Sequence, residues 1–110
     1  MNDLDIPLLS VEELDRLRRT GEECVLLDVR EPFEREIARI PGSVPIPLGR
    51  LPELWPQLDR SRRTVIHCHY DVRSREACRF LRWVGFEQVQ VLEGGIDAWA
   101  ERIDPTLARY

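Results

Sequence analysis

Short apolar runs that alternate with helical patterns constrain the fold of this chain more than any other feature. Residues 24–29 read Cys-Val-Leu-Leu-Asp-Val, and residues 64–68 read Thr-Val-Ile-His-Cys. Both runs are too short for a helix, and their nearly continuous apolar character is typical of strands that are buried on both faces. Residues 88–92 form a third run that we interpret as a strand.

Helical patterns fill the segments between these strands. The capping-box pair Ser10 and Glu13 predicts the start of a helix over about residues 10–20, which Gly21 ends. We expect further helices over residues 31–37, 74–84 and 96–101. Residues 48–58 carry a leucine-rich stripe interrupted by two prolines, which predicts a short or irregular helix. Residues 40–47 are so rich in proline that we expect only turns and a short extended piece.

This alternation of strands and helices predicts an α/β fold in which helices cover both faces of a mostly parallel sheet. The chain has 110 residues, of which 43% are hydrophobic, and this fits one domain over residues 1–110. We expect its core over about residues 8–103, followed by a tail, residues 104–110, that shows no pattern. In open sheets of this kind the ligand crevice lies beyond the carboxyl ends of the strands, which points to the loop after residues 64–68.

Charge and hydropathy exclude several functions. The net charge is -4 and the charges of both signs are interspersed, so we expect no nucleic-acid partner. No apolar run approaches twenty residues, so we expect no membrane span. Asp3 and Asp5 stand where a secretory leader carries basic residues, so we expect a cytoplasmic protein. We expect the three tryptophans to lie in the core or at its boundary: Trp55, Trp83 and Trp99.

Cys68 is the candidate for chemistry. It begins the loop Cys-His-Tyr-Asp-Val-Arg-Ser, residues 68–74, between a buried strand and the start of an amphipathic helix. In that place several backbone N–H groups can converge on the sulfur. Together with the positive helix end and Arg73, these groups favour the thiolate form of Cys68. We therefore expect Cys68 to be a nucleophile that needs no separate base. Cys24 and Cys78 lie on apolar patterns, and we interpret both as packing residues.

The two histidines beside Cys68 raise two alternatives, a catalytic Cys-His pair and a metal site. His67 should point to the opposite side of its strand from Cys68, and no acidic or amide residue that would orient a catalytic histidine can be identified. His67, Cys68 and His69 are consecutive, so they cannot easily face one ion. We expect no metal and no cofactor.

The sequence resembles the rhodanese family. The resemblance rests on four motifs in the family's order and spacing, from about residue 10 to residue 99: Leu26-Leu-Asp-Val-Arg-Glu31 with Phe33-Glu34, Ile40-Pro-Gly42 with Ile46-Pro-Leu48, the loop over residues 68–74, and Leu92-Glu-Gly-Gly95 with Trp99. It implies a five-stranded, mostly parallel sheet flanked by helices on both faces. It also implies a ping-pong sulfurtransferase reaction.

By this resemblance, Cys68 forms the persulfide. The loop that follows cradles the substrate, and its matched positions are His69, Tyr70, Asp71, Val72 and Arg73. Arg73 matches a basic position that could hold an anionic leaving group. The partners implied are a sulfur donor such as thiosulfate, a polysulfide or a persulfide, and an acceptor such as cyanide, a thiol or a thiol protein. We expect a monomer or a weak dimer.

Other positions of the motifs look structural. Asp28 and Arg30 should fix the turn after their strand, and Gly95, with its neighbour Gly94, should allow close approach of the backbone.

The chain departs from the family pattern at two places. Asp71 stands where glycine is common, and Ala38-Arg39 replaces a common Gly-His. Asp tolerates a left-handed backbone better than most residues, so we expect the loop to close. The Asp71 carboxylate should nevertheless disfavour thiosulfate, because it brings negative charge to a site for anions.

Two other functions stay open. In related phosphatases and arsenate reductases the corresponding loop resembles a pattern of Cys, five residues and then Arg. Here only four residues separate Cys68 from Arg73, and this tighter loop suits one sulfur atom better than a phosphate. The second alternative is a non-enzymatic regulatory or sulfur-carrier binding module, because a fold does not dictate an activity.

Overall fold

A five-stranded parallel sheet forms the centre of residues 5–110, the part of the chain that this computed structural model describes. The strand order is β1-β5-β4-β2-β3, and each neighbouring pair runs parallel. The strands are β1 (Leu8–Leu9), β2 (Val25–Asp28), β3 (Val44–Pro45), β4 (Thr64–His67) and β5 (Val89–Leu92). This confirms the expected sheet; Asp3 and the other residues before Asp5 lie outside the described part.

The helices follow the predicted order. They are α1 (Val11–Arg19), α2 (Pro32–Ile37), α3 (Leu51–Leu54), α4 (Val72–Trp83) and α5 (Gly95–Arg102). Short 3₁₀ turns, η2 (Leu48–Arg50) and η3 (Trp55–Gln57), flank α3, as the two prolines in this segment predict. The capping box at the start of α1 is confirmed, because Ser10 Oγ accepts the Glu13 N–H at 3.1 Å and the Glu13 carboxylate accepts the Ser10 N–H at 3.3 Å.

Two features differ from the sequence expectation by more than a residue at an element's end. Helix α4 begins at Val72, two residues earlier than predicted, so its first turn is part of the loop after Cys68. Strand β1 was not predicted, because Leu8–Leu9 is too short for a periodic pattern and is held by its pairing with β5.

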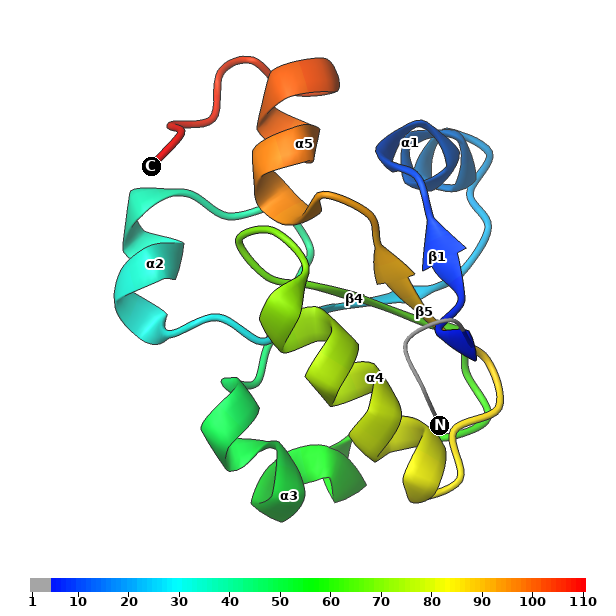
Figure 1. Cartoon of the computed structure of the whole chain (residues 1–110). Coiled ribbons are helices and arrows are strands. Elements are labelled where there is room, and N and C mark those ends of the chain that lie inside the picture. The colour runs from blue at the N-terminus through cyan, green and yellow to red at the C-terminus, as the bar shows by residue number, and fades with distance from the viewer. Residues whose placement is uncertain (1–4) are drawn as a thin grey trace.

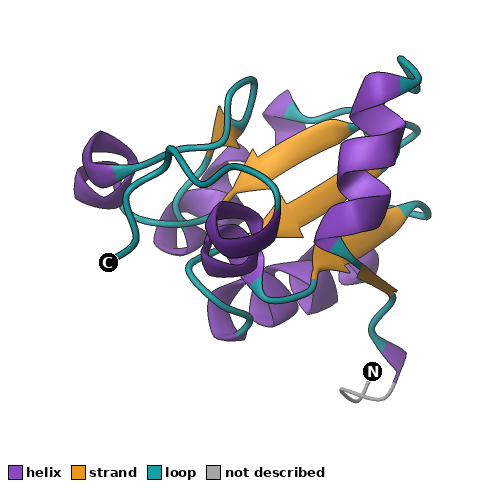
Figure 2. Cartoon of the chain, turned by 90° about the horizontal axis from the view of Figure 1, so that it is seen from above, coloured by secondary structure: helices purple, strands orange, loops and turns teal. Residues whose placement is uncertain are grey.

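Helices cover both faces of the sheet, as predicted. Figure 1 shows α1 and α5 together on one side of the sheet and α3 and α4 on the other. Figure 2 shows the strands side by side as one layer among the helices. Each face has its own cluster of buried side chains: Leu27, Ile66, Val91 and Leu81 belong to the α4 side, and Leu26, Val65, Leu92 and Trp99 to the α1–α5 side.

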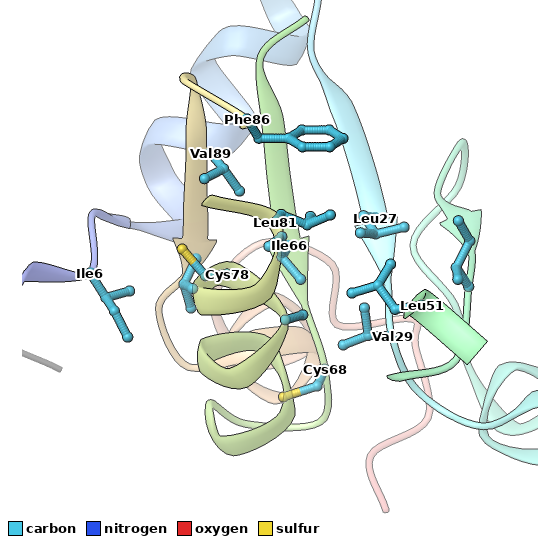
Figure 3. Close-up of a cluster of buried hydrophobic side chains, with 13 residues drawn as sticks. Ile6, Leu27, Val29, Leu51, Ile66, Cys68, Cys78, Leu81, Phe86 and Val89 are labelled. Atoms are coloured by element: carbon cyan, nitrogen blue, oxygen red, sulfur yellow. The ribbon is translucent and has the colours of Figure 1, made fainter. Parts of the chain in front are cut away.

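Alternation along β4 decides where the two residues at its end point. Ile66 and Cys68 join the cluster on the α4 side, where Figure 3 shows the Cys68 side chain beside α4. His67 lies between them in sequence and has the opposite orientation, with its Nε2 3.9 Å from Asp28 Oδ2. The expectation that His67 points away from Cys68 is confirmed.

Among the described residues, no helix is long and apolar enough to cross a membrane.

Candidate functional site

The Cys68 sulfur lies against the first turn of α4. The Ser74 N–H donates to Cys68 Sγ at 3.4 Å, and the Cys68 thiol donates to Ser74 Oγ at 3.4 Å. Ser74 Oγ in turn donates to the Asp71 carbonyl at 2.9 Å. Both Cys68 and Ser74 are buried, at 1% and 0% exposure. Because α4 starts at Val72, the sulfur is close to the positive end of this helix.

The backbone of the loop is turned by its contacts with α5. The Ile96 N–H donates to the Cys68 carbonyl at 3.0 Å, and the Asp97 N–H donates to the His69 carbonyl at 3.2 Å. A Cβ atom at Gly95 would lie 2.5 Å from the Tyr70 carbonyl oxygen and 2.6 Å from those of Cys68 and His69. Three consecutive carbonyl groups therefore face α5, and only glycine leaves room for them. The expected close backbone approach at Gly95 is confirmed.

This arrangement decides where the loop amides point. In a trans peptide the N–H points opposite to the C=O of the preceding residue, and the described residues contain no cis peptide bond. The N–H groups of His69, Tyr70 and Asp71 therefore point away from α5. Such consecutive amides are suited to bind an anion.

Asp71 braces the loop instead of adopting a left-handed backbone. Its φ is -137° and its ψ is -22°, so the expected left-handed conformation is not needed. Its Oδ1 accepts the N–H of Gly94 at 2.9 Å, which ties the loop to the connection between β5 and α5. The carboxylate where glycine is common thus has a structural partner.

Arg73 is held by Glu34 from α2. Its two terminal nitrogens donate to the two carboxylate oxygens at 2.5 and 2.9 Å, which is a bidentate pair. Bonding to Arg73 lowers the pKa of Glu34 to about 2, and bonding to Glu34 raises the pKa of Arg73. Glu34 is 5% exposed and Arg73 is 32% exposed, so the pair holds the guanidinium at a fixed place on the rim of the loop.

His69 lies between two tyrosine rings. Its ring stacks on Tyr70 with centroids 4.1 Å apart, and on Tyr110 with centroids 3.9 Å apart and planes within 8°. The Tyr110 hydroxyl donates to Glu34 Oε2 at 2.7 Å and accepts from Arg30 Nη1 at 2.8 Å. Burial raises the pKa of Tyr110 to about 12, which keeps the hydroxyl protonated. The tail that showed no sequence pattern therefore reaches this site.

The predicted role of Asp28 and Arg30 is confirmed. Arg30 donates through its backbone N–H and Nε to Asp28 Oδ1, both at 3.0 Å, and through Nη2 to Oδ2 at 2.9 Å. Arg35 donates to the same Oδ2 at 2.8 Å. Burial acts to raise the pKa of Asp28, but the bonds from Arg30 outweigh it and the pKa is lowered. Burial lowers the pKa of His67 to about 4, so His67 is neutral at pH 7.

The other two cysteines have the environments of packing residues. Cys78 is fully buried in the cluster on the α4 side, and burial raises the pKa of its thiol to about 11. Cys24 is half-buried against the cluster on the α1–α5 side. Among residues 5–110, no group of three or more His, Cys, Asp or Glu side chains could hold a metal ion.

A pocket of about 910 Å³ is lined by residues outside the loop and does not include Cys68. It is lined mainly by α2, by the segment that follows β3 and by Leu107. Two of the four arginines on its wall, Arg30 and Arg35, bond to Asp28.

Of the six predicted site residues, Cys68 has its thiol at the first turn of α4, and residues 69–71 point their backbone N–H groups away from α5. Val72 is 79% exposed and directs its side chain to solvent, while Arg73 is paired with Glu34. Sequence reasoning missed the contact with Ser74, which its place six residues after Cys68 in a strand-loop-helix unit could have indicated. It also missed the roles of Glu34 and Tyr110, because their partners Arg73 and His69 lie far from them in the sequence.

Comparison with known proteins agrees with this geometry. A sulfurtransferase of Allochromatium vinosum is 34% identical over 108 residues, which cover 98% of this chain and 96% of that protein. A rhodanese-related protein of Thermoplasma volcanium, 32% identical, superposes with a TM-score of 0.80 over 88% of this chain and 93% of its own.

Some other curated relatives are much longer proteins. The probable adenylyltransferase/sulfurtransferase MoeZ of Mycobacterium tuberculosis is 36% identical over 93 residues, and this chain spans only 24% of its length. The sequence model of the rhodanese-like domain family matches residues 10–102, from the cap of α1 to the end of α5. With the parallel sheet, the loop after β4 and full-length relatives named sulfurtransferases, this match shows that the chain belongs to the rhodanese-like domain family.

Proposed function

We propose that this protein is a sulfurtransferase that carries a sulfane sulfur as a persulfide on Cys68. The observation that supports this best is the position of the sulfur, which accepts the Ser74 N–H at the first turn of α4 while three loop carbonyls face the other way toward α5. Both features favour negative charge at the sulfur and on a terminal persulfide sulfur.

In the first half of the reaction, the Cys68 thiolate attacks the outer sulfur of a donor such as thiosulfate. A new S–S bond forms at Cys68, the donor's own S–S bond breaks, and sulfite leaves with the electron pair of the broken bond. The amides of His69, Tyr70 and Asp71 would then donate to the persulfide anion, with Val72 at the mouth of the loop. Arg73 would be the basic group that holds the departing anion, and Glu34 fixes its orientation.

In the second half, a nucleophilic acceptor removes the outer sulfur. Cyanide attacks this sulfur, the persulfide S–S bond breaks, and thiocyanate forms while Cys68 returns as a thiolate. A thiolate acceptor reacts in the same way and becomes a persulfide itself. No oxidant and no separate base are required, which agrees with the lack of a histidine aimed at Cys68: His67 points to the opposite face of the sheet.

Donor preference follows from Asp71. Its carboxylate is bonded to Gly94 and adds a negative charge close to the loop, so a neutral or protein-bound persulfide is a better donor than the dianion thiosulfate. The acceptor we propose is a small thiophile or a thiol on another protein.

The test is a turnover assay with cyanide as acceptor and thiosulfate, polysulfide and a low-molecular-weight persulfide as donors. Cys68→Ser should abolish thiocyanate production, while Cys24→Ser and Cys78→Ser retain it. Equal loss in all three variants would contradict the assignment of Cys68. Turnover of an aryl phosphate that depends on Cys68 would instead support phosphatase chemistry, which the four-residue spacing to Arg73 disfavours.

A further inference from the structure

Residues 104–110 return from α5 to the loop after Cys68 and are fixed at three points. Leu107 packs against the cluster on the α1–α5 side of the sheet. Arg109 forms a bidentate pair with Asp97 of α5, with N–O distances of 3.1 and 3.0 Å. Tyr110 makes the third contact, at the loop itself. Figure 1 shows this segment passing from the end of α5 toward α2.

The side chain of Tyr110 reaches both ends of the loop. Its ring stacks on His69, the residue directly after the sulfur-bearing cysteine, with centroids 3.9 Å apart and planes within 8°. Its hydroxyl donates at 2.7 Å to the Glu34 carboxylate that also binds Arg73, the residue at the other end. The hydroxyl is oriented in turn by Arg30 Nη1, which donates to it at 2.8 Å. One residue thus links the two ends through separate contacts.

We propose that residues 104–110 form a strap over the loop and that Tyr110 is a positioning residue for sulfur transfer. The strap holds the His69 and Arg73 ends of the loop in place, and with them the amides that point away from α5. The inference rests on the proposed function, and it concerns a segment outside the match to the family model, which ends at residue 102. Tyr110 acts through His69 and Glu34 and does not itself meet the donor.

The contacts of Tyr110 suit positioning better than core packing. Its side chain is 37% exposed, so it fills no buried space whose loss would leave a large cavity. What it contributes is a fixed plane against His69 and a hydrogen bond to Glu34. Small displacements of catalytic groups cost up to about 100-fold in rate, whereas a half-exposed contact of this kind contributes little to global stability.

The experiment compares the wild type with Tyr110→Ala, Tyr110→Phe and Thr106→Ala. Thr106 lies in the same segment and bonds only to Asp104, so Thr106→Ala is the matched control. The maximal rate of persulfide formation on Cys68 is measured by rapid quench and mass spectrometry over a range of polysulfide concentrations. Circular dichroism gives the Tm of each variant.

We expect Tyr110→Ala to lower the maximal loading rate about tenfold, to change the half-saturating donor concentration less than twofold, and to lower the Tm by only a few degrees. Tyr110→Phe keeps the ring on His69 but loses the hydrogen bond to Glu34, so it should recover only part of the rate. Thr106→Ala should load at the wild-type rate. Equal loading rates in wild type and Tyr110→Ala would overturn the inference. It would also be overturned if the rate lost in Tyr110→Ala matched the fraction of unfolded protein and Tyr110→Phe recovered none of it.

A second readout does not depend on sulfur transfer. The chain has two histidines, so the ring protons of His69 can be assigned by NMR against those of His67. Loss of the Tyr110 ring should move the His69 signals downfield and leave those of His67 in place. If the wild type loads no sulfur from any donor, the proposed function fails and the positioning role fails with it. If the wild type loads and unchanged His69 signals show that Tyr110 is not stacked there, the inference alone fails.

Discussion

Replacing Glu34 by Gln removes the negative charge that fixes Arg73 and keeps the shape of the side chain. The carboxylate accepts two bonds from Arg73, at 2.5 and 2.9 Å, and one from Tyr110 at 2.7 Å. The Glu34 side chain is only 5% exposed, so water does not take the place of the lost charge. The variant should therefore fold with a weaker link between α2 and the loop.

The size of the effect follows from the pKa of Glu34. Bonding to Arg73 is the main cause that lowers this pKa from 4.5 to about 2. That difference corresponds to about 3 kcal/mol in favour of the charged form in the folded protein. Arg73 is 32% exposed and partly screened by water, so we expect Glu34→Gln to lower the free energy of unfolding by about 2 kcal/mol. For a domain of this size the Tm should fall by about 8 °C.

The sign of the pH dependence gives a sharper test. Because the pKa is lowered in the folded state, the stabilisation is complete above about pH 4.5 and is lost as the pH falls through about 2. The stability gap between wild type and Glu34→Gln should thus be full at about pH 7 and less than half as large at about pH 3. Other titrating groups are common to both proteins and cancel in the difference.

Urea unfolding of both proteins, followed by circular dichroism at several pH values, measures this gap. A gap below about 0.5 kcal/mol at neutral pH would refute the reasoning, because the pair would then behave as an ordinary surface ion pair. A gap that stays constant down to about pH 3 would also refute it, since the stabilisation would then not depend on the charge of Glu34.

Substitutions at three further positions, one of them with a matched control, test other parts of the account. Asp71→Asn removes the charge but keeps an acceptor for Gly94, so it should lower the KM for thiosulfate with little change in Tm. Asp71→Gly also removes the acceptor and should lower both the KM and the Tm. A KM that is unchanged in both variants would show that the carboxylate does not repel the donor. His67 has a pKa of about 4 against the ordinary 6.5, so stability should be complete above about pH 6.5 and fall by about 3 kcal/mol by about pH 4, and His67→Gln should flatten this dependence in urea titrations. Gly95→Ala places a Cβ 2.5 Å from a loop carbonyl and should lower the free energy of unfolding by about 3 kcal/mol or more. Gly21 also has a positive φ but nothing within 4 Å of an added Cβ, so Gly21→Ala should lower it by only about 1 kcal/mol. Equal losses of Tm in the two variants would contradict the close approach at Gly95.

The sheet could be predicted because its central strands carry their own signal. The runs that became β2 and β4 are buried on both faces, so nearly every residue in them is apolar. Their alternation also placed Cys68 and His67 on opposite faces correctly. Edge strand β1 could not be found in this way, since two residues have no period and its stability comes from β5.

Features that depend on distant partners could not be predicted. Nothing in the sequence says that Arg73 pairs with Glu34, 39 positions away, or that Tyr110 lies on His69. Trp83 was expected in the core or at its boundary and is 80% exposed. It lies two positions after the buried Leu81, which is about half a turn around α4 and therefore on the outer face of the helix. Side-chain type predicts burial only where the tertiary structure supplies a neighbour.

The most direct test of the central claim is the mass of the intact protein after incubation with polysulfide or a persulfide donor and removal of the excess. We predict an added mass of about 32 Da, one sulfur atom, on wild type, Cys24→Ser and Cys78→Ser, and its absence on Cys68→Ser. Cyanide should then remove the mass and release about one thiocyanate per protein. A wild-type protein that acquires no such mass from any donor, or a Cys68→Ser variant that acquires it equally, would contradict sulfur transfer through Cys68.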